Sequence, residues 1–168
     1  MGVAGIMMII ASGKPKIWDK QPELGAVRAA EAYTGTFHRL SQAYARKFAS
    51  EYLILSPRYG FLAPDDWVRE TYDVRFTIRG VNSETIQMED LKALWKEKGC
   101  EPQELVTIVA GKKFVPLIEA ITEGKNPLST PLSGAKGIGD MQGRLKRALL
   151  SGKPLPDLTD QEKRGSNK

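Results

Sequence analysis

The stretch "GTFHRLSQAYARKFASEYLILS", residues 35–56, carries the pattern that decides the fold. Four apolar side chains recur at helical spacing in its first part, at Phe37, Leu40, Tyr44 and Phe48. This spacing predicts a helix with one face packed inward. The last part, "YLILS" from Tyr52 to Ser56, is a continuous apolar run with the length of a buried strand. A helix that leads into such a strand is the second half of a βαβ unit.

Two other apolar runs, "GIMMIIA" (residues 5–11) and "LVTIVA" (residues 105–110), also lack polar alternation. Continuous runs of this kind are typical of parallel strands that helices cover on both faces. Helical patterns occupy residues 86–99 and 111–124. Residues 126–139 are predicted to be a loop, and a last helix is predicted from a cap at Asp140. The sequence therefore predicts an α/β fold, a single-domain Rossmann-like sandwich with a mainly parallel sheet flanked by helices.

The length of 168 residues fits one domain, which we place at residues 1–150. Residues 151–168 contain few large apolar side chains and two prolines, and are predicted to be a solvated tail. The chain has one cysteine, Cys100, and one histidine, His38. These numbers exclude an internal disulfide and a zinc site with several thiolates, so we predict no metal and no cofactor. We interpret Cys100 as inert and His38 as a structural or surface residue.

The charge of the chain is mildly basic, with a net charge of +5 and an isoelectric point near 9.3. Such a balance is compatible with phosphate-bearing partners such as nucleotides or nucleic acid. No apolar run approaches the roughly 20 residues of a membrane span, and the first residues lack the features of a secretion signal. We therefore expect a cytoplasmic protein with no membrane partner.

Two of the predicted strands are followed by glycine and lysine. Ser12, Gly13 and Lys14 follow the first strand, and Gly111 and Lys112 follow the third. The carboxyl ends of parallel strands meet at one edge of a sheet, where ligands collect, and a helix N-terminus stabilises anions. One interpretation is a shared phosphate site, and the alternatives are a plain turn and a pair of surface lysines.

Polar and aromatic residues crowd the loop "SPRYGFLAPDDWVRETYD", which follows the second strand. The residues of this loop that we assign to a ligand site are Ser56, Tyr59, Gly60, Asp65, Tyr72 and Asp73. Loops that carry binding or catalytic groups are more elaborate than simple connections. The alternative is an internal latch, in which an arginine of the loop pairs with one of its carboxylates and the tyrosines fill the core.

The segment "SGAKGIGDMQGRLKRALLSGK", residues 133–153, carries five basic residues and one acidic residue. We expect its first part to be a loop in which Gly137 and Gly139 allow a tight turn into the last helix. It does not match the dinucleotide-binding pattern GxGxxG. The basic helix is either a solvated face or a surface that contacts phosphates.

Five motifs together, "AYTGTFHRL", "YLILSPRYGFLAPDD", "TYDVRF", "VAGKKF" and "PLSGAKGIGDMQGRL", resemble a bacterial and phage family that is similar to the peroxide-stress YaaA proteins. The resemblance covers residues 9–149. It implies an α/β fold whose pocket is built from the loop after the first strand, the segment of Tyr33, Thr34 and Gly35, the Ser-x-x-Tyr-Gly loop and the late glycine-rich turn. Related domains occur with enzymes that exchange bases in DNA or transfer RNA.

Members of that family commonly have a cysteine in the loop after the first strand, where this chain has Ala11-Ser12-Gly13-Lys14. This difference argues against chemistry that needs a thiol. We therefore expect a protein that binds or processes a nucleotide, modified base or nucleic acid, by glycosidic-bond or base-transfer chemistry. The catalytic candidates are Asp65, Asp73 and Tyr59, because a carboxylate acts as nucleophile or general base in such reactions.

Two alternative functions remain at this point. The first is a non-catalytic nucleic-acid-binding module that uses the basic C-terminal helix for backbone contacts. The second is a scaffold whose polar loop docks a partner chain. Salt dependence distinguishes the first alternative, because binding to a phosphate backbone weakens steeply with salt.

Overall fold

The computed structural model describes residues 6–156 and has a mixed α/β architecture. Its main sheet has five strands in the order β4-β3-β1-β6-β7, and β4 runs antiparallel to β3 while the other neighbours pair in parallel. The strands are β1 (Met7–Ala11), β3 (Glu51–Ser56), β4 (Gly60–Leu62), β6 (Val106–Val109) and β7 (Leu128–Ser129). The mostly parallel sheet predicted from the three apolar runs is confirmed.

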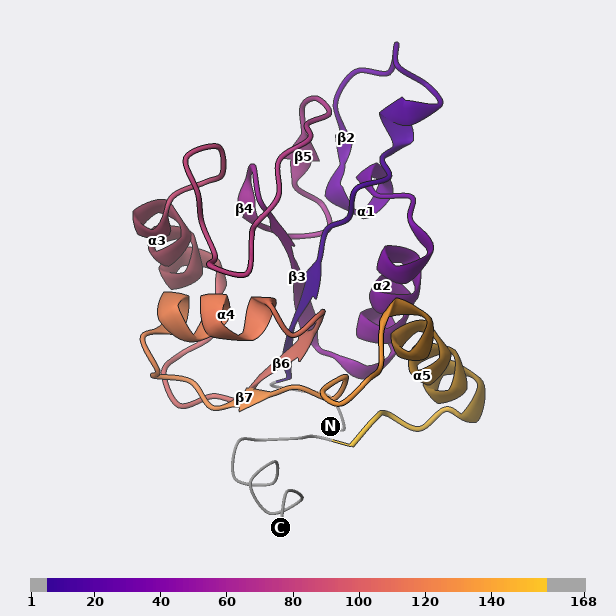
Figure 1. Cartoon of the computed structure of the whole chain (residues 1–168), viewed down its shortest axis with the longest axis vertical. Helices are drawn as coiled ribbons and strands as arrows, with labels where there is room; N and C mark the ends of the chain where they lie inside the picture. The colour runs from indigo at the N-terminus through magenta and orange to yellow at the C-terminus, as the bar shows by residue number, and fades with distance from the viewer. Residues whose placement is uncertain (1–5, 157–168) are drawn as a thin grey trace.

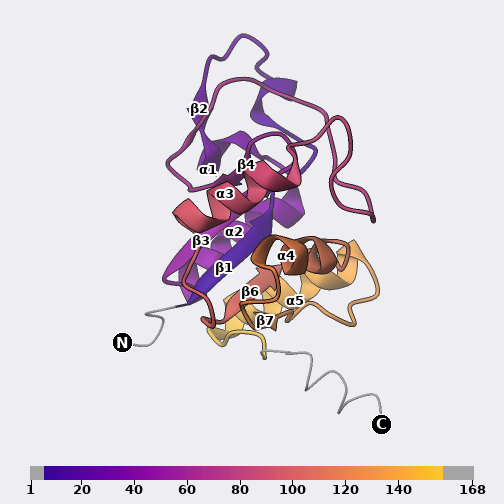
Figure 2. The same ribbon diagram turned by 90° about the vertical axis from the view of Figure 1, so that its left-hand side faces the viewer.

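Helices cover both faces of the main sheet, with α2 and α5 on one side and α3 and α4 on the other (Figure 1). Figure 2 views the molecule from the side of α3 and α4, with the sheet behind them. The helical elements are η1 (Ile17–Asp19), α1 (Ala29–Ala32), α2 (Thr36–Phe48), α3 (Met88–Lys98), α4 (Phe114–Thr122) and α5 (Ile138–Ser151).

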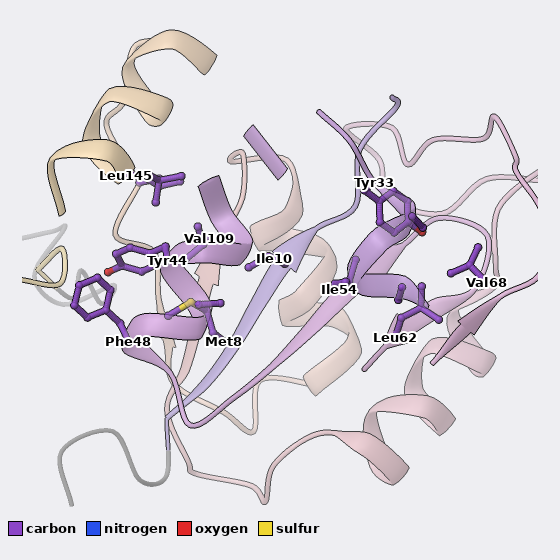
Figure 3. Close-up of a cluster of buried hydrophobic side chains, with 14 of the residues drawn as sticks. Met8, Ile10, Tyr33, Tyr44, Phe48, Ile54, Leu62, Val68, Val109 and Leu145 are labelled. Carbon is purple, nitrogen blue, oxygen red and sulfur yellow. The ribbon is translucent and has the colours of Figure 1, made fainter. Parts of the chain in front are cut away.

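Strand β1 shows why its sequence is apolar throughout. Successive side chains of a strand point to opposite faces of the sheet. Met8 and Ile10 pack in the cluster beneath α2 and α5, which Figure 3 shows in close-up. Met7 and Ile9 pack in the cluster beneath α3 and α4. Because both faces are covered by helices, every position of the strand except its last is buried.

The chain does not continue as a loop after β3, so the prediction for that segment is wrong in part. Residues 60–62 fold back as β4, with Gly60 opposite Ser56 and Leu62 opposite Ile54. Gly60 has φ of +77°, a left-handed conformation that glycine adopts at no steric cost. A three-residue strand is too short to give a periodic signal in the sequence, so tertiary packing decides its formation.

The predicted loop at residues 126–139 and the helix after it also need correction. The loop contains β7, a two-residue strand that pairs with β6. Helix α5 begins at Ile138, before Asp140, and its N-cap is Gly137. Asp140 acts from the first turn of the helix instead, where its carboxylate accepts a hydrogen bond of 2.9 Å from the backbone amide of Lys136.

A second, small sheet pairs β2 (Val27–Arg28) with β5 (Trp67–Val68) in antiparallel fashion. The Arg28 guanidinium lies 3.9 Å from the centre of the Trp67 ring, a cation–π contact. In Figure 1 this small sheet lies above the carboxyl ends of β1 and β3.

The segment predicted as a solvated tail begins with Ser151, which is the last residue of α5. The backbone amide of Leu155 then donates a 2.9 Å hydrogen bond to the hydroxyl of Tyr44, and the Leu155 side chain packs against the core. The rest of the predicted tail, from residue 157 onward, lies outside the described residues. In residues 6–156 no helix is both long enough and apolar enough to cross a membrane.

Candidate functional site

The loops that follow β1 and β6 lie at the same edge of the sheet, because the two strands are parallel neighbours. Ser12, Gly13 and Lys14 from the first loop and Lys113 from the second line one cavity of about 240 Å³. The sequence placed both loops at a ligand-collecting edge, and the structure brings them to a common cavity. We call this the aromatic cavity, for the side chains described next.

The walls of the aromatic cavity combine rings with positive charge. Its ring-bearing lining residues are Phe37, Pro57, Tyr72, Phe76 and Phe114. Its charged lining residues are Lys14, Lys16, Arg75 and Lys113, with Asp73 as the carboxylate. Four cations against one anion give the lining a positive balance. Flat apolar surfaces beside cationic groups suit a planar ring system that is attached to a negatively charged group.

A buried hydrogen-bond cluster reaches the wall of this cavity through Tyr72. The hydroxyl of Tyr72 lies 2.5 Å from that of Tyr33 and 2.7 Å from Oγ of Ser56. Burial raises the pKa of both tyrosines well above the ordinary value. The phenols therefore stay neutral and act as hydrogen-bond donors and acceptors, not as bases. Tyr59 supports the cluster by packing edge-on against the ring of Tyr72, 5.5 Å between centres.

Lys16 is a member of the site that the sequence analysis missed. The residue is 4% exposed, and its Nζ donates hydrogen bonds to the carbonyls of Gly13 (3.2 Å) and Lys14 (2.9 Å). The same ammonium lies 4.4 Å from the centre of the Tyr72 ring. Burial lowers its pKa from the ordinary value. Lysines in loops are mostly exposed, so nothing in the local sequence distinguishes this one.

His38 fixes the loop after β1 from the side of α2. Its Nδ1 lies 2.8 Å from the carbonyl oxygen of Ala11 and 3.0 Å from that of Ser12. Because carbonyls only accept, Nδ1 carries the proton, and Nε2 accepts a 3.0 Å hydrogen bond from the amide of Gln42. Burial lowers the pKa of His38, which keeps the ring neutral. Of the two interpretations from sequence, the structural one holds.

The segment of Tyr33, Thr34 and Gly35 supports the loop after β1, and none of the three residues lines the aromatic cavity. The backbone amide of Thr34 donates a 3.0 Å hydrogen bond to the carbonyl of Pro15. Gly35 is the N-cap of α2, and a Cβ at this position would lie 3.3 Å from Cγ of Pro15. Tyr33 reaches the site through its hydroxyl contact with Tyr72. These three residues therefore stabilise the loop after β1 and the position of Tyr72, both of which line the aromatic cavity.

Two other predicted site residues lie away from the aromatic cavity. Asp65 is an exposed residue of the turn between β4 and β5, and its backbone carbonyl accepts a 2.8 Å hydrogen bond from Arg28. Gly60 faces α3, where an added Cβ would meet Leu94 and Ile86. Neither residue lines the aromatic cavity. Among the predicted carboxylates, Asp73 is the one placed in its wall.

The ion pair that the latch interpretation predicts, between an arginine and a carboxylate of this loop, is not found among the described residues. Asp66 pairs with Lys98 of α3 at 2.5 Å, not with an arginine of its own loop. Its carboxylate also accepts a 2.8 Å hydrogen bond from the amide of Ala63. Tyr72 is 9% exposed, so it fills core space and lines the cavity at once.

A second cavity of about 640 Å³ adjoins the first, and Lys113 and Met141 line both. Gly111, Lys112 and Gly137 line this second cavity, together with Lys136, whereas Gly139 lies outside it in the first turn of α5. We call it the lysine cavity. The residues predicted to share one phosphate site are thus divided between two neighbouring cavities.

The described residues offer few alternatives for reactive chemistry. Within residues 6–156 no group of three His, Cys, Asp or Glu side chains is placed to hold a metal ion. Burial raises the pKa of the Cys100 thiol, which disfavours the reactive thiolate. The amide of Asn126 also lies 3.6 Å from its sulfur.

Replacing Tyr72 by phenylalanine should lower the free energy of unfolding by about 1–3 kcal/mol, because Tyr33 and Ser56 each lose a buried hydrogen-bond partner. Chemical denaturation measures this change. Tyr59→Phe is the matched control, since its hydroxyl makes only a 3.5 Å contact with the carbonyl of Glu70 and should change stability by less than about 0.5 kcal/mol. Equal losses in the two variants would contradict the assigned cluster.

Comparison with known proteins corrects the resemblance proposed from the motifs. The model of a family of unknown function (DUF6884) matches residues 18–147. The "Uncharacterized protein YfjM" of Bacillus subtilis (strain 168) is 41% identical over 143 residues, which cover 85% of this chain and 94% of that protein. Neither finding links the chain to the peroxide-stress YaaA proteins, so that assignment is wrong. The chain belongs to the family of unknown function DUF6884.

Proposed function

We propose that this protein binds a nucleotide or a modified base, with the base in the aromatic cavity. In this proposal the chain is one Rossmann-like domain that works in the cytoplasm, where nucleotides and nucleic acids are found. The observation that carries the proposal is the aromatic cavity itself. Rings and cationic groups converge there, at the carboxyl edge of a mostly parallel sheet.

The size and lining of the aromatic cavity favour a single ring system. Its volume of about 240 Å³ is below the roughly 300–1,000 Å³ that is typical for drug-sized ligands. Phe114 is half-buried in the wall, and its ring packs edge-on against Phe76, 6.3 Å between centres. Stacking of a base on an aromatic side chain contributes about 1–3 kcal/mol. Phe114 is the ring we assign to this contact.

Asp73 takes the acid–base role in the proposal, with a glycosidic-bond or base-transfer reaction as the chemistry. It is an exposed carboxylate in the cavity wall, adjacent in the chain to Tyr72. The buried tyrosines are unsuited to this role, because their raised pKa values keep them protonated. A carboxylate that faces the ligand can accept a proton or attack the sugar carbon.

Thermal-shift screening with nucleosides, nucleoside monophosphates and free bases tests the binding proposal. A ligand present at 100 times its Kd stabilises the folded state by about 2.7 kcal/mol, so one base series should raise Tm while the others leave it unchanged. Phe114→Leu should weaken that ligand by about tenfold or more, because stacking is lost. Phe48→Leu is the matched control, since Phe48 is the last residue of α2, lies in the core and lines neither cavity.

Two outcomes would contradict the proposal. In one, no compound of the screen changes Tm. In the other, Phe114→Leu and Phe48→Leu change affinity equally. If oligonucleotides bind with steep salt dependence, and binding is weakened by loss of the exposed Lys146 and Arg147 but not by Phe114→Leu, the non-catalytic nucleic-acid module is favoured instead.

A further inference from the structure

We propose that the lysine cavity binds the phosphate-bearing part of the nucleotide whose base occupies the aromatic cavity. This inference rests on the proposed function and specifies its ligand class. The ligand is a base that carries an anionic extension, either the phosphates of a free nucleoside triphosphate or the phosphodiester of an adjoining nucleotide in a strand. Both sources present the same chemistry to the cavity.

The two cavities are continuous in their lining, since Lys113 and Met141 belong to the walls of both. The Lys113 ammonium donates a 3.1 Å hydrogen bond to the carbonyl of Phe76, which also lines the aromatic cavity. Lys113 is therefore held at the junction of the two cavities. In this arrangement the base lies in the aromatic cavity, and the Lys113 ammonium lies next to the bond between the sugar and the first phosphate.

The lining of the lysine cavity lacks both the aromatic rings and the carboxylate that line the aromatic cavity. It includes three lysines, Lys112, Lys113 and Lys136, and neither an acidic nor an aromatic residue. Lys112 and Lys136 are exposed, and the ion pairs found in the described residues involve neither of them. Unpaired ammonium groups in a concave site favour an anion over a second base.

Asp140, in the first turn of α5, does not cancel this charge. The carboxylate of Asp140 accepts hydrogen bonds from the backbone amide of Lys136 (2.9 Å) and from the Arg144 guanidinium (3.4 Å). Its negative charge is therefore already partnered within the first turn of α5. For the same reason the α5 N-terminus is not the source of anion binding here. The lysine side chains are the groups that we expect to contact phosphate.

The glycines of this wall leave room for a ligand to approach the backbone. Gly134 has φ of +86°, and a Cβ built there would meet no atom within 4 Å. Gly137, the N-cap of α5, is equally open. At about 640 Å³ the lysine cavity is larger than the aromatic one, so it has room for more than one phosphate group. This size favours a triphosphate or an adjoining nucleotide over a monophosphate.

The test is isothermal titration calorimetry of the full chain with four base series, those of adenine, guanine, cytosine and uracil. Each series contains the nucleoside, the 5′-monophosphate, the 5′-triphosphate and the dinucleotide, and inorganic tripolyphosphate is a separate probe. We expect the triphosphate or the dinucleotide of one series to bind about tenfold or more tighter than its nucleoside, because charged hydrogen bonds are added. Which of these two binds more tightly identifies the source of the phosphate.

The variants Lys112→Ala and Lys136→Ala should remove most of that gain, about fivefold each, while the Kd of the nucleoside stays unchanged. Lys146→Ala is the matched control, an exposed lysine of α5 that does not line either cavity. All three side chains are exposed, so the variants should fold normally. Circular dichroism confirms the fold before titration.

The outcomes separate this inference from the function on which it rests. Equal affinity for nucleoside and triphosphate, or equal effects of Lys112→Ala and Lys146→Ala, would overturn the phosphate assignment and leave base binding intact. Binding of tripolyphosphate that Lys112→Ala abolishes, with no nucleoside bound, would overturn the proposed function and retain the anion site. The absence of binding by every probe would overturn both.

Discussion

Replacing His38 by alanine is expected to lower the free energy of unfolding by about 3 kcal/mol. The side chain is 2% exposed, and its Nδ1–H donates to the carbonyls of Ala11 and Ser12. Alanine would leave these two carbonyls and the Gln42 amide with one partner fewer in a buried setting, and would also leave a cavity. Urea denaturation followed by circular dichroism measures the loss.

The neighbouring substitution Arg39→Ala is the control, because Arg39 is exposed on the same helix. It should change the free energy of unfolding by less than about 0.5 kcal/mol. The loop after β1 also forms part of the aromatic cavity, so binding of the proposed ligand to the His38→Ala protein should weaken even at temperatures where this variant is fully folded. If the His38→Ala protein is as stable as the Arg39→Ala protein, His38 does not support this loop.

The same histidine predicts how stability depends on pH. Burial holds the pKa of His38 in the folded state below the value of about 6.5 that an unfolded chain has. The unfolded state therefore takes up the proton more readily, and the free energy of unfolding should fall as pH decreases below about 6.5. The slope approaches about 1.4 kcal/mol per pH unit for a single group until the folded-state pKa is reached.

This dependence can be assigned to one residue, because the chain contains a single histidine. The free energy of unfolding of His38→Ala should be nearly independent of pH between about 5.5 and 6.5, whereas the wild-type protein should lose stability there. Denaturation curves at several pH values measure both. If the two proteins show the same slope, the ring is not held neutral by burial.

Replacing Gly60 by alanine should lower the free energy of unfolding by about 2–3 kcal/mol, the second largest loss expected after that of His38→Ala. The residue has φ of +77°, where a side chain is strained. An added Cβ would also lie 2.5 Å from Cδ1 of Leu94 and 2.8 Å from Cδ1 of Ile86, so both side chains must move. Thermal or urea denaturation gives the magnitude.

Gly124→Ala separates these two causes. Gly124 has φ of +69°, but a Cβ there would meet nothing within 4 Å. This control should therefore show only the backbone strain, about 1–2 kcal/mol. The difference between the two variants reports the steric contact with α3. Equal losses would mean that α3 accommodates the methyl group freely, and that the left-handed turn alone requires glycine at the start of β4.

The sequence by itself determined the three central strands of this protein and the helices that cover them. The apolar runs around Ile9, Leu53 and Ile108 identified the parallel strands β1, β3 and β6, because side chains on both faces of each strand are buried. Helical spacing identified α2, α3 and α4 within a few residues. The sequence also indicated the edge of the sheet at which the loops with Ser12 and Lys113 meet, since that follows from parallel pairing.

Only the tertiary structure decided how that edge is built. The hydroxyls of Tyr33 and Tyr72 meet although the two residues are 39 positions apart in the chain. Lys16 is buried because the carbonyls of its own loop accept hydrogen bonds from its ammonium group. The division of the glycine and lysine residues between two cavities likewise depends on where α5 packs. Such contacts leave no periodic pattern in the sequence, because each of them is made only once. Local patterns fix strands and helices, whereas the cavities arise from how these elements pack.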